Sequence, residues 1–117
     1  MKNNKLKFMR VIVFFDLPVE TNQQKRIYRQ FVKYLKNEGY IRLQYSIYSK
    51  LCINNEACAV SAKHLRQNAP IKGDVRYMIV TETQYQGIHK INNVYSIQEM
   101  ITTVDRTVMI GGMNDED

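Results

Sequence analysis

The sequence predicts an α+β domain in which two helices cover one face of an antiparallel sheet. Residues 8–18 form a short apolar stretch that ends at Asp16 and Pro18, as is typical of a central strand covered on both faces. Two stretches with helical apolar periodicity follow, each succeeded by a segment in which apolar and polar residues alternate. This order of elements matches a ferredoxin-like βαββαβ sandwich.

The chain has 117 residues, which suits one compact domain, expected over residues 8–91. Residues 1–7 form a basic extension, and residues 92–117 form a C-terminal segment with an acidic tail. No apolar run approaches the roughly 18 residues of a membrane-spanning helix, so no membrane association is expected. Cys52 and Cys58 lack metal-ligand spacing, which indicates reduced thiols and a cytoplasmic location.

The predicted first strand, about residues 7–16, brings the carboxylate of Asp16 to the end of a sheet. A carboxylate there in a basic protein suggests a Mg²⁺ ligand, because Mg²⁺ needs few protein carboxylates and activates water near a phosphodiester. An aspartate in this position also commonly caps the following loop or first helical turn. The residues alone leave these two interpretations equally open.

A helix is expected to begin near Thr21, because Thr21 and Gln24 have the spacing of a capping box, and to stop at Gly39. Its apolar stripe consists of Ile27, Tyr28, Phe31, Val32 and Leu35. Five cations lie mostly off that stripe, namely Lys25, Arg26, Arg29, Lys33 and Lys36. They form either a solvated face or a binding face. The single acid of this region, Glu38, favours binding, because a solubilising face usually mixes both signs.

The formal net charge is +6, and three of the eleven acids lie in the last three residues. This balance favours a polyanionic partner, most simply nucleic acid. Phosphate-binding glycine loops, nucleophile elbows and His/Cys metal clusters are absent from the sequence. The paired aromatics of the common RNA-recognition motif are absent too, so readout by base stacking is not supported.

Strict alternation over residues 41–51 predicts one long strand, or two strands joined by a bend or bulge. The apolar side carries Ile41, Leu43, Tyr45, Ile47 and Leu51. The other side carries Arg42, Gln44, Ser46, Tyr48 and Lys50. Beside a basic helix this polar side could bind phosphate, whereas on an exposed sheet it is ordinary polar surface.

A second helix is expected over about 55–68, capped near Asn54, with its apolar stripe at Ala57, Val60, Ser61, His64 and Leu65. Residues 75–82 alternate on two mixed faces, which predicts an interior strand, and residues 85–91 suggest a turn and a short edge strand. The sheet face without helices predicts a homodimer. A late short strand containing Thr107, Val108, Met109 and Ile110 is expected to dock on another chain.

Three stretches, Met9–Pro18, Tyr28–Phe31 and Arg42–Tyr48, together resemble the Cas2 family of small CRISPR-associated spacer-acquisition proteins, in its type II-A version. The resemblance covers most of residues 8–91. It implies a homodimer that binds double-stranded DNA, prespacer and repeat, and bridges two dimers of a larger integrase. It also implies that Asp16 is the catalytic Mg²⁺ ligand of an endonuclease acting on RNA or DNA.

A DNA scaffold of this kind would grip the phosphate backbone without reading bases. The expected nucleic-acid-binding residues are Arg10, Lys25, Arg26, Arg29, Lys33, Lys36, Arg42, Gln44 and Ser46. Two alternatives stay open: a stand-alone metal-dependent nuclease that integration does not need, and a regulatory metabolite-binding domain of the same fold. The charge and the missing glycine-rich ligand loop disfavour the second alternative.

Overall fold

The structure is a computed structural model that describes residues 7–92. Its elements are β1 (Met9–Asp16), α1 (Asn22–Asn37), β2 (Ile41–Gln44), β3 (Ile47–Cys52), α2 (Asn55–Asn68), β4 (Asp74–Thr81) and α3 (Glu82–Gln86). Residues 88–92 belong to a separate unit and contain no helix or strand. None of the helices in residues 7–92 is long and apolar enough to cross a membrane.

The four strands form one antiparallel sheet in the order β2-β3-β1-β4. The apolar first strand is therefore central, as predicted, and the βαββαβ order is confirmed. The interior position predicted for β4 is wrong, because in residues 7–92 this strand pairs with β1 alone. The side chains of β4 that point away from the helices belong to the open surface of the sheet, where Met78 is 48% exposed.

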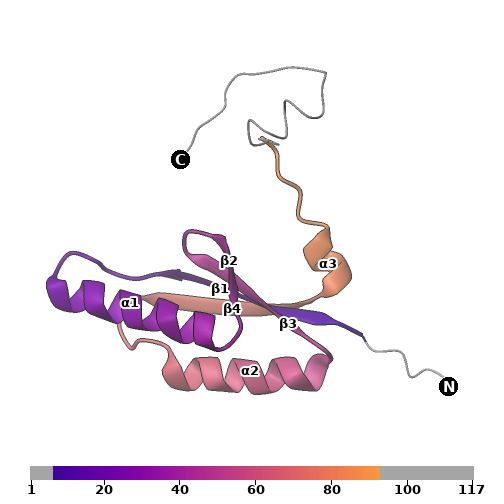
Figure 1. Cartoon of the computed structure of the whole chain (residues 1–117), viewed down its shortest axis with the longest axis horizontal. Coiled ribbons are helices and arrows are strands. Elements are labelled where there is room, and N and C mark those ends of the chain that lie inside the picture. The colour runs from indigo at the N-terminus through magenta and orange to yellow at the C-terminus, as the bar shows by residue number, and fades with distance from the viewer. Residues whose placement is uncertain (1–6, 93–117) are drawn as a thin grey trace. The chain divides into compact units, whose positions relative to one another are not determined.

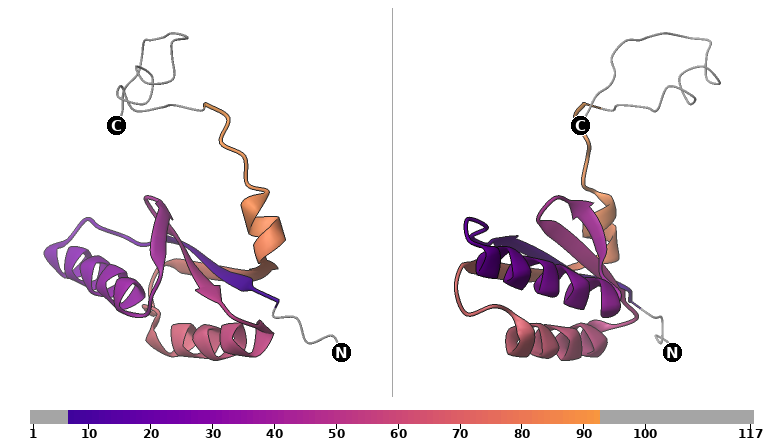
Figure 2. Two further views of the ribbon diagram at one scale, coloured as in Figure 1. Left: turned by 45° about the vertical axis from the view of Figure 1, so that its right-hand side comes forward. Right: turned by 60° about the vertical axis from the view of Figure 1, so that its left-hand side comes forward.

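Helices α1 and α2 lie on the same side of the sheet (Figures 1 and 2). The inward residues of β1, Val11 and Val13, are fully buried against this layer together with Phe15. The ring of Phe15 lies edge-on to Phe31 of α1, with the ring centroids 5.1 Å apart. Because side chains alternate along a strand, the other residues of β1, among them Asp16, point to the face without α1 and α2.

Local hydrogen bonds set the helix starts. The hydroxyl of Thr21 accepts from the backbone N–H of Gln24 (3.1 Å), and the Gln24 side chain accepts from the backbone N–H of Thr21 (3.0 Å), so the capping box is confirmed. Asn54 caps α2 by accepting from the backbone N–H of Ala57 (2.8 Å). The buried side of α2 includes Ser61 and Leu65 as predicted, but the stripe positions Val60 and His64 are exposed.

Two predictions for the strands need correction. The alternating segment is a hairpin whose turn is Tyr45–Ser46, with a register shift between Arg42 and Gln44, so the alternation does not keep one face along it. Tyr48 pairs with Arg42 on the side predicted to be polar, but that side faces the helices, so Tyr48 is buried in the core. The short edge strand predicted over 85–91 is wrong, because residues 85 and 86 end α3, which a second capping box formed by Thr81 and Gln84 starts, and residues 87–91 contain no strand. The strand predicted over 107–112 lies outside the described residues.

Candidate functional site

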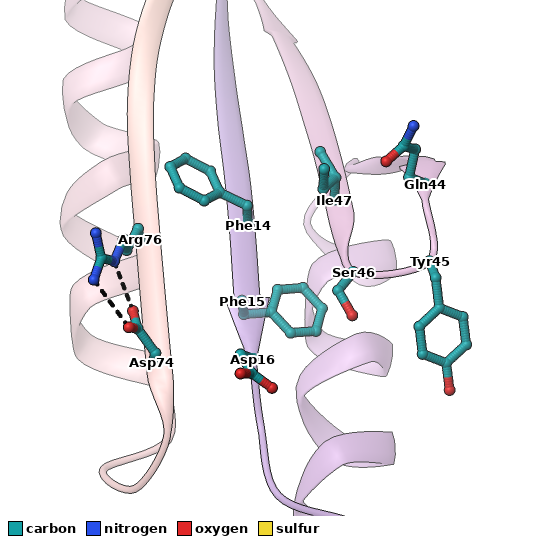
Figure 3. Close-up of a pocket in the computed structure, with 9 residues that line it drawn as sticks. All are labelled: Phe14, Phe15, Asp16, Gln44, Tyr45, Ser46, Ile47, Asp74 and Arg76. Carbon is teal, nitrogen blue, oxygen red and sulfur yellow. Dashed lines mark hydrogen bonds and ion pairs between the residues drawn. The ribbon is translucent and has the colours of Figure 1, made fainter.

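Asp16 is the last residue of β1, and its exposed carboxylate lies between the β2–β3 turn and the start of β4 (Figure 3). Its register partner on β4 is Asp74. Both carboxylate oxygens of Asp74 accept hydrogen bonds from Arg76, at 2.8 and 3.1 Å, and this pairing holds the pKa of Asp74 below its usual range. Asp16 takes part in none of the ion pairs among residues 7–92.

An open pocket of about 490 Å³ surrounds the Asp16 carboxylate. All four strands and the β2–β3 turn line it, and the residues are Phe14, Phe15, Asp16, Gln44, Tyr45, Ser46, Ile47, Asp74 and Arg76. Two of the predicted nucleic-acid-binding residues, Gln44 and Ser46, thus line the same pocket as Asp16. The pocket combines one available carboxylate, polar side chains and an arginine, which suits a phosphate ester held near a hydrated cation.

Two turns fix the backbone around Asp16. On one side, the N–H of Phe15 donates to the carbonyl of Ser46 (3.1 Å) and ties the hairpin turn to the end of β1. On the other side, the turn before β4 packs against residues 16–18 through Gly73, which has φ +101°. A Cβ at this glycine would lie 2.6 Å from Leu17 Cδ2 and 3.1 Å from the carbonyl oxygen of Asp16. Only glycine therefore fits without shifting the segment that carries Asp16.

Asp16 does not cap the first turn of α1, because Thr21 is the N-cap residue of that helix. Residues 7–92 contain no group of three or more His, Cys, Asp or Glu side chains that could hold a metal. The Asp16 pocket therefore offers one carboxylate that is not engaged, Asp16, and a second, Asp74, that Arg76 already binds. Such a donor set fits Mg²⁺ that keeps most of its waters, and does not fit a cation that needs a full protein cage.

The basic residues of α1 form a continuous stripe. Lys25, Arg29, Lys33 and Lys36 follow each other at spacings of four, four and three residues, which places them on one side of the helix, and all four are exposed. No acid lies within α1 to neutralise them. Arg26 is exposed as well, at the edge of the stripe on the side of Lys33.

A groove of about 410 Å³ runs between α1 and the β2–β3 hairpin. Four of the predicted cations line it, Arg29, Lys33, Lys36 and Arg42. The remaining lining is mostly aromatic and apolar, with Tyr28, Val32, Tyr45 and Tyr48 beside the polar Asn37. We call this hollow the basic groove. Exposed lysine and arginine side chains grouped in this way suit contact with the phosphates of a nucleic-acid backbone.

Arg10 lies apart from both hollows, near the start of β1. Its Nε donates to Glu82 Oε1 (2.6 Å), its Nη2 donates to Glu82 Oε2 (3.1 Å), and its guanidinium carbon lies 4.1 Å from the centroid of the Tyr85 ring. The side chain is 12% exposed. The hydrogen bonds to Arg10 hold the pKa of Glu82 below its usual range. The structure thus gives Arg10 an internal partner and does not bring it to the other predicted cations.

Among the residues of these hollows that sequence reasoning did not assign to a site are Asp74, Arg76 and Tyr45. The i, i+2 spacing of Asp74 and Arg76 on a strand was a usable signal, because it places both side chains on one face. The proximity of Asp74 to Asp16 depends on strand register, for which the sequence carries no local signal. Tyr45 was expected on the apolar side of a strand, but it lies in the hairpin turn and lines both hollows.

Comparisons with known proteins agree on one family. The model of the family described as CRISPR associated protein Cas2 matches residues 9–88. A protein of Ligilactobacillus salivarius, named CRISPR-associated endoribonuclease Cas2, is 38% identical over 102 residues, which are 87% of this chain and 100% of the relative. A relative of the same name from Treponema denticola is 41% identical with the same coverage. One from Streptococcus mutans is 40% identical over 84 residues, which are 72% of this chain and 77% of the relative.

Proposed function

The chain belongs to the Cas2 family of CRISPR-associated proteins, and its role is therefore in CRISPR adaptation. We propose that it acts there as a homodimer that binds double-stranded DNA, both prespacer and repeat, and bridges two dimers of the larger integrase. The observation that carries this proposal is the basic groove, with the unopposed cationic stripe of α1 along its edge.

The basic groove favours binding of the DNA backbone over reading of the bases. Its cations are exposed lysine and arginine side chains of α1 and β2, a placement that suits contact with phosphates along a duplex. Binding of this kind releases counterions, so the affinity falls steeply with salt. Each phosphate contact contributes about 0.9 to the slope of log affinity against log salt concentration.

A salt titration of duplex binding by the full chain tests this proposal. The variant Arg29→Gln/Lys33→Gln removes two groove cations, so we expect the slope to fall by about 1.8, which is about 0.9 per lost contact. The control is Lys63→Gln, which removes an exposed lysine from α2 outside the groove, and it should leave the slope unchanged. A salt-insensitive wild type would favour the metabolite-binding alternative, and an unchanged slope in the double variant would reject the groove.

The homodimer is proposed to form through the sheet face opposite α1 and α2. In residues 7–92 no long helix covers this face, and it carries exposed apolar side chains, including Ile41, Leu51 and Met78. Burying such a patch against a second copy removes apolar surface from water. Sedimentation of the wild type should show twice the chain mass, and Leu51→Glu should return it to 13.8 kDa. A wild type that sediments only at 13.8 kDa contradicts this part.

The segment Thr107–Ile110 is proposed as the strand that docks on a partner subunit, by strand addition to an exposed sheet edge. A chain truncated after residue 106 tests this role. We expect the truncated chain to bind duplex DNA as the full chain does but to lose co-purification with the larger integrase. Retained co-purification would remove this segment from the interface.

A second candidate function is Mg²⁺-dependent cleavage of RNA or DNA, favoured by the pocket around Asp16 and by relatives that are named endoribonucleases. Asp16 is the residue proposed to hold the cation. When bound there, Mg²⁺ would supply polarisation of the phosphodiester and a more acidic water. The backbone of Asp16 is held in place by the turns at Ser46 and Gly73, so the position from which the carboxylate extends is fixed.

The variant Asp16→Asn separates the two functions, with Glu20→Gln as the control for loss of an exposed acid nearby. We expect Asp16→Asn to abolish Mg²⁺-dependent cleavage while duplex binding and spacer acquisition in cells continue. If acquisition is also lost in a folded dimer, catalysis by this chain is needed for adaptation. If cleavage persists in Asp16→Asn, this residue is not the metal ligand.

A further inference from the structure

Tyr45 has an unusual position for an aromatic residue. Its side chain is 68% exposed, more than any other exposed aromatic in residues 7–92, and it lies in the tight turn between β2 and β3. Figure 3 shows its ring at the outer edge of the Asp16 pocket, pointing away from the pocket wall formed by β1. A tyrosine that contributes this little to the core has most of its ring available to a ligand.

Neighbouring groups hold the Tyr45 ring in place. The Tyr28 ring lies nearly parallel to it, with centroids 6.1 Å apart and an angle of 25° between the planes. The guanidinium carbon of Arg42 lies 5.5 Å from the Tyr45 centroid. The next residue, Ser46, is tied to β1 through its carbonyl. A ring ordered before binding loses less conformational entropy when a ligand stacks on it.

Tyr45 is also the one residue that lines both the basic groove and the Asp16 pocket, as these hollows are described in residues 7–92. A nucleic-acid strand that has its phosphates on the groove cations and a phosphate near Asp16 must pass this ring. Aromatic side chains stack on bases of any sequence, because every base has a π-face. Inside a duplex the bases are paired and covered by their neighbours, so only an unpaired base can reach Tyr45.

We propose that Tyr45 is a stacking site for one unpaired nucleobase, placed between the basic groove and the Asp16 pocket. The preferred ligand is therefore a nucleic acid with single-stranded nucleotides beside its duplex part, such as a duplex with an overhang. This inference rests on the proposed binding of DNA by the basic groove. It differs from an RNA-recognition motif, whose paired aromatics lie on a strand, because here a single ring is presented by a turn.

The test compares two probes bound to the full chain: a blunt DNA duplex, and the same duplex with short single-stranded adenine overhangs that contain 2-aminopurine. The overhang duplex should bind more tightly to the wild type and show quenched 2-aminopurine fluorescence. Tyr45→Leu should weaken overhang binding by about 5- to 150-fold, the range for loss of one stacked base, and remove the quenching. Tyr45→Phe keeps the ring and should retain both.

Blunt-duplex binding should be the same in Tyr45→Leu and the wild type, since the groove cations remain. Tyr77→Leu serves as the matched control, because Tyr77 is a partly exposed tyrosine on β4 that lines neither hollow. Equal weakening of both probes by Tyr45→Leu, or no change in either, overturns the stacking site. A Tyr45→Leu protein that becomes monomeric overturns it too, because the ring would then contact a second copy.

These outcomes are distinguishable from failure of the proposed function. If the wild type binds both duplexes with a salt dependence that Arg29→Gln/Lys33→Gln reduces, DNA binding by the groove stands whatever Tyr45 does. If the wild type binds neither duplex, the groove proposal fails and the stacking site fails with it. Tight binding of the overhang duplex that depends on Tyr45 but not on Arg29 and Lys33 would keep the stacking site and reject the groove.

Discussion

The pairing of Arg10 with Glu82 can be measured as a contribution to stability. The two side chains make two charge-assisted hydrogen bonds, at 2.6 and 3.1 Å, and they join the start of β1 to α3. The guanidinium of Arg10 lies over the face of the Tyr85 ring, and the Tyr85 hydroxyl lies 3.0 Å from Ser49 Oγ. We therefore consider the variants Arg10→Met, Glu82→Gln and the double variant.

The expected magnitude follows from the burial of the pair. Exposed ion pairs are worth about 0.2–1 kcal/mol, whereas breaking a buried pair costs about 3–5 kcal/mol. Arg10 is 12% exposed and Glu82 is 26% exposed, so this pair lies between the two limits. We expect a coupling energy of about 1.5–2 kcal/mol from the double-mutant cycle. Arg10→Met alone should cost about 0.5–1 kcal/mol more than Glu82→Gln, because it also loses the contact with Tyr85.

Urea denaturation of the wild type, the two single variants and the double variant gives the coupling energy from the shifts in the unfolding midpoint.

The pH dependence of the stability supplies an independent check. Arg10 lowers the pKa of Glu82 in the folded state, so its stabilisation is present above the ordinary carboxylate pKa and is lost as the pH falls through the folded-state value. The wild type and Glu82→Gln should therefore converge in stability at acidic pH. A coupling energy below about 0.5 kcal/mol at pH 7 would refute the reasoning from burial, because a coupling that small is typical of a fully exposed ion pair.

The same Arg10→Met protein decides whether Arg10 also binds DNA. If the guanidinium is fully engaged by Glu82, the salt slope of duplex binding should match the wild type. A slope lower by about 0.9 would show that Arg10 contacts a phosphate and that the pairing with Glu82 opens in the complex.

Three further predictions concern stability and reactivity. Thr21→Ala should lower the free energy of unfolding by about 1 kcal/mol, while Thr21→Ser retains the cap to Gln24; equal urea midpoints for both variants would contradict this role. Gly73→Ala should cost at least about 1–2 kcal/mol for its left-handed backbone, with more from the clash with Leu17, and thermal unfolding near the wild-type temperature would count against it. Burial raises the pKa of the Cys58 thiol to about 12, so iodoacetamide should label Cys58 in urea but not in the native protein at pH 7, and rapid native labelling would disprove its enclosure.

Local signals in the sequence predicted the helices well. The capping boxes and side-chain caps act within three residues, so Thr21 and Asn54 mark the starts of α1 and α2 without any knowledge of the fold. The same signal was present at Thr81 and Gln84, where the alternation of the preceding strand hid it and α3 was missed. The central place of β1 was predictable too, because its apolar run requires neighbours and cover on both faces.

Features that depend on strand register could not be predicted. The proximity of Asp74 to Asp16 arises from pairing between strands 58 positions apart in the chain. The register shift places Gln44 opposite Ile47, with Tyr45 in the exposed turn between them. Tyr48 is buried because its pairing with Val13 of β1 puts it on the face that the helices cover. Helical spacing was enough to predict that Lys33 and its neighbours on α1 share one surface. It could not show that Arg10 lies away from that surface and pairs with Glu82.

The two functions proposed for the two hollows could be removed one at a time. The cations of the basic groove lie on α1 and β2, whereas the Asp16 carboxylate lies at the end of β1 and is positioned by turns that contain no groove cation. Neutralising Asp16 therefore leaves the groove charge intact, and neutralising groove cations leaves the scaffold of the carboxylate intact. Since Tyr45 borders both hollows, it is the side chain through which a bound strand would connect DNA binding to chemistry at Asp16.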